Sequence, residues 1–242
     1  MQILHAKIFG QDKPGTPLLV FHGLFGMLDN WGSFGKEMGE FFPVHLIDLR
    51  NHGKSFHSAE MSHDDLAHDI AHYMEFHHIE KANLLGHSLG GKAVMQFAIK
   101  YPIKVQKLIV VDISPKAYPP HHQGILKALE SVDFENLKTR QQVEEVLQQY
   151  IPEKSVIQFL AKNLYWKDDK KLDWRFNLKT LSEKYSDFVS NAIKFGVFTG
   201  ETLFIAGAKS NYILPQDEFQ IKQQFPNSSI VKIPSAGHWV QA

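Results

Sequence analysis

The chain has 242 residues, of which 43% are hydrophobic and 21% charged, an ordinary balance for a globular protein with a full core. Basic and acidic residues number 26 each, so no net positive charge directs the protein to nucleic acid or to an anionic membrane surface. The absence of cysteine excludes disulfides, a thiolate nucleophile and cysteine-ligated zinc. The N-terminal stretch MQILHAKIFG lacks the pattern of a signal peptide, and no apolar run reaches the roughly 20 residues of a membrane helix. We therefore expect a cytoplasmic protein without stable membrane insertion.

Short apolar runs alternate with helical patterns along most of the chain. Continuous runs rich in valine, isoleucine and leucine are typical of parallel strands that are covered on both faces. Such runs occupy residues 18–23, 44–49, 83–88, 107–113, 202–208 and 229–234. Helical periodicity marks residues 63–76 and 91–102. The alternation predicts an α/β fold, a mostly parallel central sheet flanked by helices, with ligands bound beyond the carboxyl ends of the strands.

The helix predicted at 63–76 and the residues directly after it carry an unusual number of histidines. They are His63, His68, His72, His77 and His78. Such a cluster could bind a metal, but no set of carboxylates surrounds it. We expect a solvated helix face and no metal site.

The alternation stops between about residue 115 and residue 200, where no strand pattern is found. Helices are predicted instead at 124–134, 139–151 and 154–164, the second with a capping box formed by Thr139 and Gln142. We interpret residues 115–197 as a helical insertion into a single α/β core, which comprises residues 1–114 and 198–242. The aromatic residues of the insertion either wall an apolar pocket or pack its own small core, and both alternatives stay open. They are Phe159, Tyr165, Trp166, Trp174 and Phe176.

The segment NLLGHSLGG places Ser88 between Gly86 and Gly90, at the end of a predicted strand and the start of a predicted helix. The pattern G-x-S-x-G indicates a turn so sharp that the serine is strained and flanking side chains would clash. The turn lifts the hydroxyl above the sheet edge and directs the Leu89 N–H at an incoming oxyanion. We interpret Ser88 as a nucleophile.

A second element of the same chemistry comes earlier in the chain. His22 and Gly23 directly follow the apolar run LLVF, and in a fold of this type the next residue, Leu24, donates the other N–H to the oxyanion. A single His-Gly pair is weak evidence. The pair precedes GHSLGG in the chain, and both motifs directly follow a predicted strand. This arrangement strengthens the interpretation.

At these motifs the chain resembles the α/β-hydrolase family, and more closely the YbfF-like bacterial esterases and their mitochondrial abhydrolase relatives. GHSLGG alone is typical of the whole superfamily, whereas DLRNHGKS and LFIAGAKSNYI are more specific. The segments that carry the resemblance are residues 21–31, 48–55, 86–95, 110–115, 203–213 and 236–239. The resemblance implies the α/β-hydrolase fold, with the insertion as its helical cap. Members usually continue into a final helix, and whether one follows Ala242 stays open.

A serine hydroxyl needs a base to take its proton, and histidine is best matched to neutral pH. The chain has 14 histidines, and the order serine, acid, histidine along this fold selects His238 in PSAGHWV. His87 adjoins the nucleophile, but its side chain must point away, so we expect a structural role. We expect His22 to brace the oxyanion loop, and we assign His52 no chemistry.

The usual position of the acid is not occupied by a carboxylate. Most α/β hydrolases carry the acid in a pattern like G-x-x-D after the strand at 202–208, and counting from Gly207 gives Ser210. Asp217 and Glu218 lie further on, and they suit the start of a helix, where acidic residues favour the dipole.

Asp112 is the alternative acid. It ends the predicted strand that follows the helix after Ser88. Consecutive strands in such a sheet are usually neighbours, so Asp112 should lie one strand away from Ser88, within reach of His238. It could also simply cap the next turn, but the resemblance to YbfF-like enzymes, in which this aspartate is taken as the acid, favours Asp112. Asp48 also ends a strand, and we expect it to organise the neighbouring loop through Arg50 and Asn51.

These residues predict a serine esterase that needs no metal or organic cofactor. The resemblance implies small acyl esters or thioesters, with acyl-CoA as one example. We expect a monomer or homodimer that binds no nucleic acid. A carbon–carbon hydrolase with the same triad and a catalytically silent ligand receptor are the alternatives. Candidates for the substrate pocket are His22, Phe159, Tyr165, Trp166 and Trp239.

Overall fold

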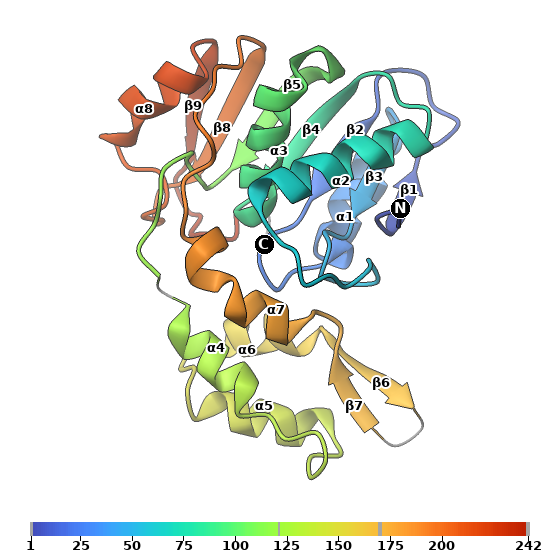
Figure 1. The fold of residues 1–242 in the computed structure, drawn as a ribbon, viewed down its shortest axis with the longest axis vertical. Helices are drawn as coiled ribbons and strands as arrows, with labels where there is room; N and C mark the ends of the chain where they lie inside the picture. Colours follow the sequence, from blue (N-terminus) through green and yellow to red (C-terminus); the bar gives the residue numbers. More distant parts are fainter. Residues whose placement is uncertain (1, 121, 169–170, 241–242) are drawn as a thin grey trace.

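The structure, a computed structural model, describes residues 2–120, 122–168 and 171–240. Its main sheet has seven strands in the order β1-β3-β2-β4-β5-β8-β9 (Figure 1). The strands are β1 (Ala6–Phe9), β2 (Leu18–Phe21), β3 (Val44–Ile47), β4 (Ala82–His87), β5 (Val105–Val111), β8 (Glu201–Gly207) and β9 (Ser228–Ile233). Each neighbouring pair is parallel except β1 and β3, which are antiparallel. The predicted α/β class with a mostly parallel sheet is therefore confirmed.

All six apolar runs that predict strands form strands, each within two residues of the expected bounds. The edge strand β1 was not predicted. Three of its four residues are only partly buried and the fourth is exposed, so its sequence, AKIF, does not show the continuous apolar run of an inner strand.

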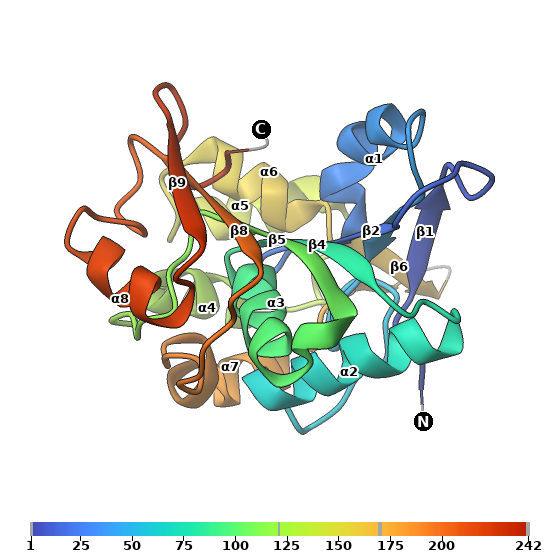
Figure 2. The same ribbon diagram turned by 90° about the horizontal axis from the view of Figure 1, so that it is seen from above.

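Helices cover both faces of this sheet (Figure 2). One face packs against α2 (His63–Phe76), α3 (Leu89–Lys100) and α8 (Asp217–Gln224), and the other against η1 (Leu28–Trp31) and α1 (Gly32–Met38). The apolar stripe of α2, with Leu66, Ile70 and Tyr73 fully buried, explains why this helix forms where the periodicity predicts it. The buried apolar side chains form two clusters, and the larger one lies on the face of the sheet that α2 and α3 cover, against β4.

The histidines of residues 63–78 do not share one solvated face, so that prediction was wrong. His63 is buried and its ring lies 4.9 Å from that of Phe188, whereas His68 and His78 are exposed. His77 packs on the ring of Tyr73 at 4.3 Å. The cause is helical geometry, because residues five or nine positions apart point to different sides. In the described residues, no three side chains of the metal-ligating kinds come together.

The insertion forms a separate layer below the core in Figure 1. It contains α4 (Gln123–Glu130), α5 (Arg140–Gln148), α6 (Lys154–Ala161), α7 (Leu178–Glu183), a π-helical turn η3 (Tyr185–Val189), and strands β6 (Leu164–Asp168) and β7 (Lys171–Trp174). The capping box of Thr139 and Gln142 is present. A short helical turn η2 (Pro102–Lys104) links α3 to β5 in the core.

The expectation of a wholly helical insertion was wrong at β6 and β7, which pair as an antiparallel hairpin. The sequence of β7, KLDW, alternates polar and apolar residues, which is the period of a strand. Leu172 and Trp174 are buried while Lys171 and Asp173 are partly exposed. Trp174 stacks on Phe176 with ring centroids 5.2 Å apart, so these two aromatic residues pack the core of the cap.

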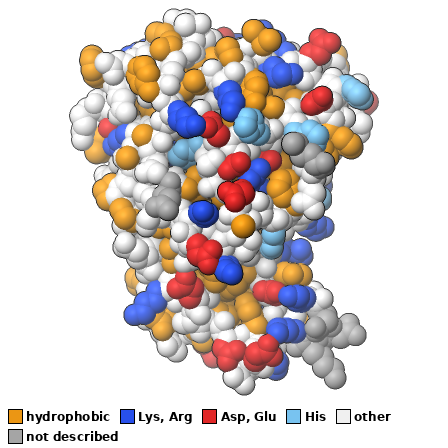
Figure 3. All heavy atoms as spheres, viewed as in Figure 1, with side chains coloured by type: hydrophobic (Ala, Val, Ile, Leu, Met, Phe, Trp, Pro, Cys, Tyr) orange, Lys and Arg blue, Asp and Glu red, His pale blue; other side chains and the backbone are white. Residues whose placement is uncertain are grey.

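The surface carries no large field of one sign on the face shown in Figure 3, where acidic and basic side chains are interspersed. Among the described residues, no helix combines the length and the hydropathy that a bilayer crossing requires.

Candidate active site

Ser88 sits in a strained turn between β4 and α3. Its φ of 51° and ψ of −114° lie outside the regions that non-glycine residues favour. The turn is fixed by its N–H, which donates to Val111 O at 3.0 Å, and by the Gly90 N–H, which donates to His22 O at 3.1 Å. A Cβ at Gly86 would lie 2.2 Å from Gly90 O, and one at Gly90 would lie 2.5 Å from Phe21 O. The glycines of G-x-S-x-G are therefore required by close backbone contacts.

Asp112 and His238 form a hydrogen-bonded pair at the same edge of the sheet. Asp112 follows β5 and is fully buried, with a φ of 49°. Its Oδ2 accepts from His238 Nδ1 at 2.7 Å, and His238, on the loop after β9, is about one-quarter exposed. This bond places the imidazole proton on Nδ1 and leaves Nε2 to accept a proton.

Ser88 and His238 line one cavity, but the residues that the structure describes include no hydrogen bond between the two side chains. In unliganded enzymes such catalytic hydrogen bonds are often long, and they tighten when the substrate binds. The structure thus brings together all three residues that the sequence predicts as a triad.

The carboxylate of Asp112 is held by the last residue of β8 and by the loop that follows this strand. Its Oδ1 accepts the Gly207 N–H at 2.9 Å, and its Oδ2 accepts the Ser210 hydroxyl at 2.5 Å. Ser210, at the position where an acid is usual in this fold, therefore donates a hydrogen bond to an acid from the neighbouring strand. Asp217 lies apart from this group, at the start of α8, and pairs with Lys116 at 2.6 Å.

Two further side chains support His238. The imidazole stacks on the ring of Tyr212, with centroids 3.9 Å apart and an interplanar angle of 17°. His87 Nε2 lies 2.8 Å from the carbonyl oxygen of His238 and donates to it. Burial, with a smaller effect of the nearby His238, lowers the pKa of His87 to about 3, so its ring is neutral at physiological pH. The expected structural role of His87 matches this position.

The oxyanion loop is a tight turn in which the Gly26 N–H donates to Gly23 O at 3.0 Å. Phe25 occupies this turn with a φ of 56°, a left-handed conformation that bulky residues rarely adopt. Leu24, directly before it, lines the cavity at Ser88. Leu89 is the first residue of α3, where a backbone N–H has no acceptor within the helix. Both predicted oxyanion donors therefore lie beside the serine.

Neutral histidines anchor this loop to the strands behind it. His22 Nδ1 lies 2.8 Å from Gly23 O, and its Nε2 accepts the Leu49 N–H at 3.1 Å. His52 Nε2 accepts the Phe25 N–H at 3.2 Å. Burial lowers the pKa to about 4 for His22 and to about 3 for His52, so each ring keeps the unprotonated nitrogen that accepts these bonds. His22 braces the loop as expected, and the support from His52 was not predicted.

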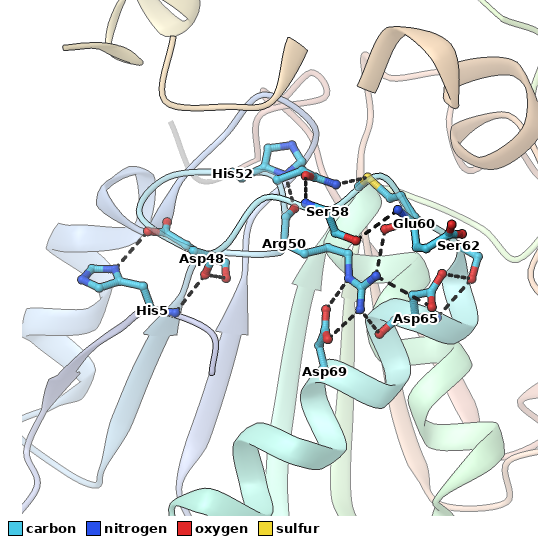
Figure 4. Close-up of polar contacts among 12 residues, drawn as sticks. His5, Asp48, Arg50, His52, Ser58, Glu60, Ser62, Asp65 and Asp69 are labelled. Atoms are coloured by element: carbon cyan, nitrogen blue, oxygen red, sulfur yellow. Dashed lines mark hydrogen bonds and ion pairs between the residues drawn. The ribbon is translucent and has the colours of Figure 1, made fainter. Parts of the chain in front are cut away.

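Asp48 organises the loop behind the oxyanion turn, but not through Arg50 and Asn51 as predicted (Figure 4). Its Oδ1 accepts the Leu28 N–H at 2.7 Å, and its Oδ2 accepts the Lys54 N–H at 2.9 Å. Arg50 instead turns to α2 and pairs with Asp69 through two hydrogen bonds of 2.6 and 2.8 Å (Figure 4). Arg50 is long enough to leave the loop and bind a carboxylate on the neighbouring helix.

Two cavities meet at Ser88. The larger has a volume of about 60 Å³, and its wall is mainly apolar side chains from the core and the cap. These include Leu24, Phe25, Trp31, Ile125, Val156, Phe159, Leu160 and Trp239. The smaller, of about 20 Å³, shares Leu24, Ser88 and His122 with the first and adds more polar side chains, among them Lys92, Tyr118, Tyr185 and Tyr212.

The pocket candidates fall into two groups. His22, Phe159 and Trp239 line the larger cavity, and the last two rings lie 5.4 Å apart. Tyr165 and Trp166 do not line it, so that expectation was wrong. They belong to the β6–β7 hairpin, which extends away from the core, and Trp166 is 56% exposed.

Two polar residues of the site were missed. His122, just before α4, lines both cavities, and its Nδ1 lies 2.8 Å from the Tyr185 hydroxyl. Lys92 is buried in α3, where it donates to the Asn191 carbonyl, and burial lowers its pKa to about 7. A lysine within the apolar helix pattern of GHSLGGKAVM was a usable signal for Lys92, whereas nothing in the local sequence marks His122.

The comparisons with known proteins agree with this geometry. The family description of the α/β hydrolase fold matches residues 16–151, more than half of the chain. A seven-stranded, mostly parallel sheet with a serine at the turn after β4 defines the same class. The chain belongs to the α/β-hydrolase family of enzymes.

Within that family, the chain is similar to proteins named as esterases and lipases. It is 34% identical to Esterase YbfF of Escherichia coli, over 99% of this chain and 92% of that protein. It is 36% identical to the sn-1-specific diacylglycerol lipase ABHD11 of Danio rerio, over 97% of this chain and 76% of that protein. A solved structure described as a marine microorganism esterase is 36% identical and superposes with a TM-score of 0.96, covering all of this chain and 94% of the other.

Proposed function

We propose that the protein is a serine esterase that cleaves small acyl esters or acyl thioesters through an acyl-serine intermediate. The observation that carries this proposal is the 2.7 Å bond between His238 and a fully buried Asp112, on a cavity that His238 shares with Ser88. The names of the relatives, esterases and diacylglycerol lipases, support ester bonds as the substrate class.

In the first half-reaction the Ser88 hydroxyl attacks the substrate carbonyl while His238 Nε2 takes its proton. Asp112 keeps the proton on Nδ1 and stabilises the positive charge that forms on the ring. The N–H groups of Leu24 and Leu89 donate to the carbonyl oxygen as it becomes negative. His238 then gives its proton to the leaving alcohol or thiol, and the acyl group stays on Ser88.

In the second half-reaction water attacks the acyl-serine carbonyl. His238 takes a proton from this water, and the same two N–H groups hold the second oxyanion. Collapse of the intermediate releases the carboxylic acid, and the proton returns from His238 to Ser88. Each proton that leaves a nucleophile is therefore returned to a leaving group.

The cavity favours a short acyl group. Its volume of about 60 Å³ is well below the ~300–1,000 Å³ that drug-sized ligands occupy, and its wall is mainly apolar. We infer that short-chain acyl groups fit without rearrangement, whereas longer chains require the cap to move. The alcohol or thiol then lies toward the open side of the site.

A panel of p-nitrophenyl esters and acyl-CoA thioesters of increasing chain length tests the proposal. We expect turnover that is highest for short acyl groups and that falls by about 10³-fold or more in Ser88→Ala. A carbon–carbon hydrolase would instead cleave a ring-fission product and leave the esters intact. A folded wild-type protein that cleaves none of these substrates would contradict the proposal and favour a silent receptor.

A further inference from the structure

The strained residue of the oxyanion turn is held from both sides of its backbone. The Phe25 N–H donates to His52, which belongs to the core, and the Phe25 carbonyl accepts from Asn163 Nδ2 at 2.8 Å. Asn163 lies two residues beyond the end of α6, so it belongs to the cap. The contact joins residues 138 positions apart in the sequence. The cap and the core therefore meet at the backbone of the turn that presents Leu24.

The Asn163 amide has a fixed orientation. Its Nδ2 also donates to Leu160 O at 3.2 Å, so both of its contacts are with carbonyl oxygens and only an N–H group can make them. The side chain is 1% exposed, and among the described residues its Oδ1 has no hydrogen-bond partner. The unpaired Oδ1 costs stability, whereas Nδ2 satisfies two buried carbonyl oxygens, one at the end of α6 and one in the oxyanion turn. The bond to Leu160 stays within the cap, so the bond to Phe25 is the contact through which this amide reaches the oxyanion turn.

Helix α6 also forms part of the acyl cavity. Val156, Phe159 and Leu160, all on this helix, line the space in front of Ser88. The same helix that contacts the acyl group thus leads directly to the residue that holds the oxyanion turn.

We propose that Asn163 is a positioning residue that keeps the Leu24 N–H directed at the oxyanion, and that it couples the cap to the oxyanion hole. The proposal rests on the function proposed above. A phenylalanine at a φ of 56° relaxes toward negative φ when it loses an anchor, because its Cβ crowds the backbone in this conformation. Relaxation at Phe25 shifts the turn from Gly23 to Gly26 and with it the Leu24 N–H.

The test compares two amides that both link the cap to the core. Asn163→Leu keeps the branching and the number of side-chain heavy atoms, removes the bonds to Phe25 and Leu160, and removes the unpaired oxygen. Asn177→Ala is the matched control, because Asn177 Nδ2 donates to Asn51 Oδ1 at 3.1 Å and not to the oxyanion turn. The measurements are kcat and KM on a short-chain ester, the inhibition constant of a trifluoromethyl ketone that forms an oxyanion on Ser88, and the melting temperature.

For Asn163→Leu we expect kcat to fall about 10- to 100-fold, below the ~10²- to 10³-fold loss from deleting a whole donor. KM should change by less than about twofold, and inhibitor binding should weaken by about the same factor as kcat, since both depend on the oxyanion. Asn177→Ala should leave kcat and inhibitor binding within about twofold. Asn163→Ala should repeat the result for Asn163→Leu.

Wild-type kcat in a folded Asn163→Leu protein would overturn the proposal, as would equal losses in Asn163→Leu and Asn177→Ala. Unfolding of both Asn163 variants would make this residue structural and would overturn it too. Absence of any ester turnover by the wild-type protein is a different outcome, because it refutes the proposed esterase itself and, with it, this role for Asn163.

Discussion

Ser210 occupies the position where many α/β hydrolases carry their acid, yet its hydroxyl donates to the carboxylate of Asp112. The same oxygen, Oδ2, accepts from His238, so one carboxylate oxygen receives two donors. Hydrogen bonds of this kind orient a carboxylate. The loop after β8 therefore supports the acid in place of supplying it.

Substitution of each aspartate by asparagine distinguishes Asp112 from Asp217, the other candidate for the acid. Asp112→Asn should lower kcat by about 10³- to 10⁴-fold, because the amide no longer stabilises the imidazolium or holds the correct tautomer. Asp217→Asn should change kcat by less than about threefold, since Asp217 pairs with Lys116 at the start of α8. Steady-state kinetics on one short ester measure both variants. If the two outcomes are exchanged, Asp112 is not the acid.

Removal of the Ser210 hydroxyl should have a smaller effect. Ser210→Ala leaves the Gly207 N–H and His238 on Asp112 but removes one donor, so we expect kcat to fall about 10-fold with KM unchanged. Ser229→Ala, at an exposed position of β9, is the control and should match the wild type. A kcat for Ser210→Ala equal to that of the control would show that this hydrogen bond does not assist Asp112.

The side chains that could be predicted are those marked by local backbone constraints. Ser88 is marked by its glycines, and His238 and Asp112 by their positions after strands; their catalytic roles stay predictions until they are tested. The residues that support the site could not be predicted, because the bonds of Ser210 to Asp112 and of Asn163 to Phe25 join residues 98 and 138 positions apart. No short-range pattern records which distant backbone group a serine or an asparagine will meet.

Helix α6 and the β6–β7 hairpin show how the cap divides its aromatic residues. Phe159 on α6 is directed into the cavity, while Trp166 on β6 is exposed to solvent. Composition alone made both of them pocket candidates. The strand period does not account for the difference, because Trp166 pairs with the buried Leu172 and yet is 56% exposed.

Shortening Phe159 should widen the acyl cavity. We expect Phe159→Ala to move the preferred acyl chain toward longer esters, because a large ring is removed from the wall in front of Ser88. Trp166→Ala is the control, at an exposed position on the same layer, and should keep the wild-type preference. The ratio of kcat/KM between a long and a short ester measures the shift. An unchanged ratio in Phe159→Ala would place the acyl group elsewhere.

Buried neutral histidines make the stability of the protein sensitive to acid. Burial lowers the pKa of His22, His45, His52, His63 and His87 to about 3 or 4, from an ordinary value of 6.5. Below about pH 6.5 the unfolded chain binds protons at these rings that the folded chain does not bind. The free energy of unfolding therefore falls as the pH drops from about 6.5 toward 4, and these histidines add no dependence above that window.

His63 offers a direct test, because it is buried, packs on Phe188 and lines neither of the two cavities at Ser88. His63→Phe should reduce the slope of unfolding free energy against pH by about 1.4 kcal/mol per pH unit between pH 6 and 4. His68→Gln, at an exposed position of the same helix, should leave the slope unchanged. Urea unfolding at several pH values measures these slopes. Equal slopes in wild type and His63→Phe would show that His63 is not held neutral.

Labelling with a fluorophosphonate tests most directly whether Ser88 is the nucleophile of an esterase. The reagent phosphonylates an activated serine, and peptide mass spectrometry identifies the modified residue. We predict a single adduct on Ser88, none on Ser88→Ala, and loss of ester turnover in step with labelling. Ester turnover that persists without an adduct on Ser88, or an adduct on another residue that abolishes turnover, would contradict the account.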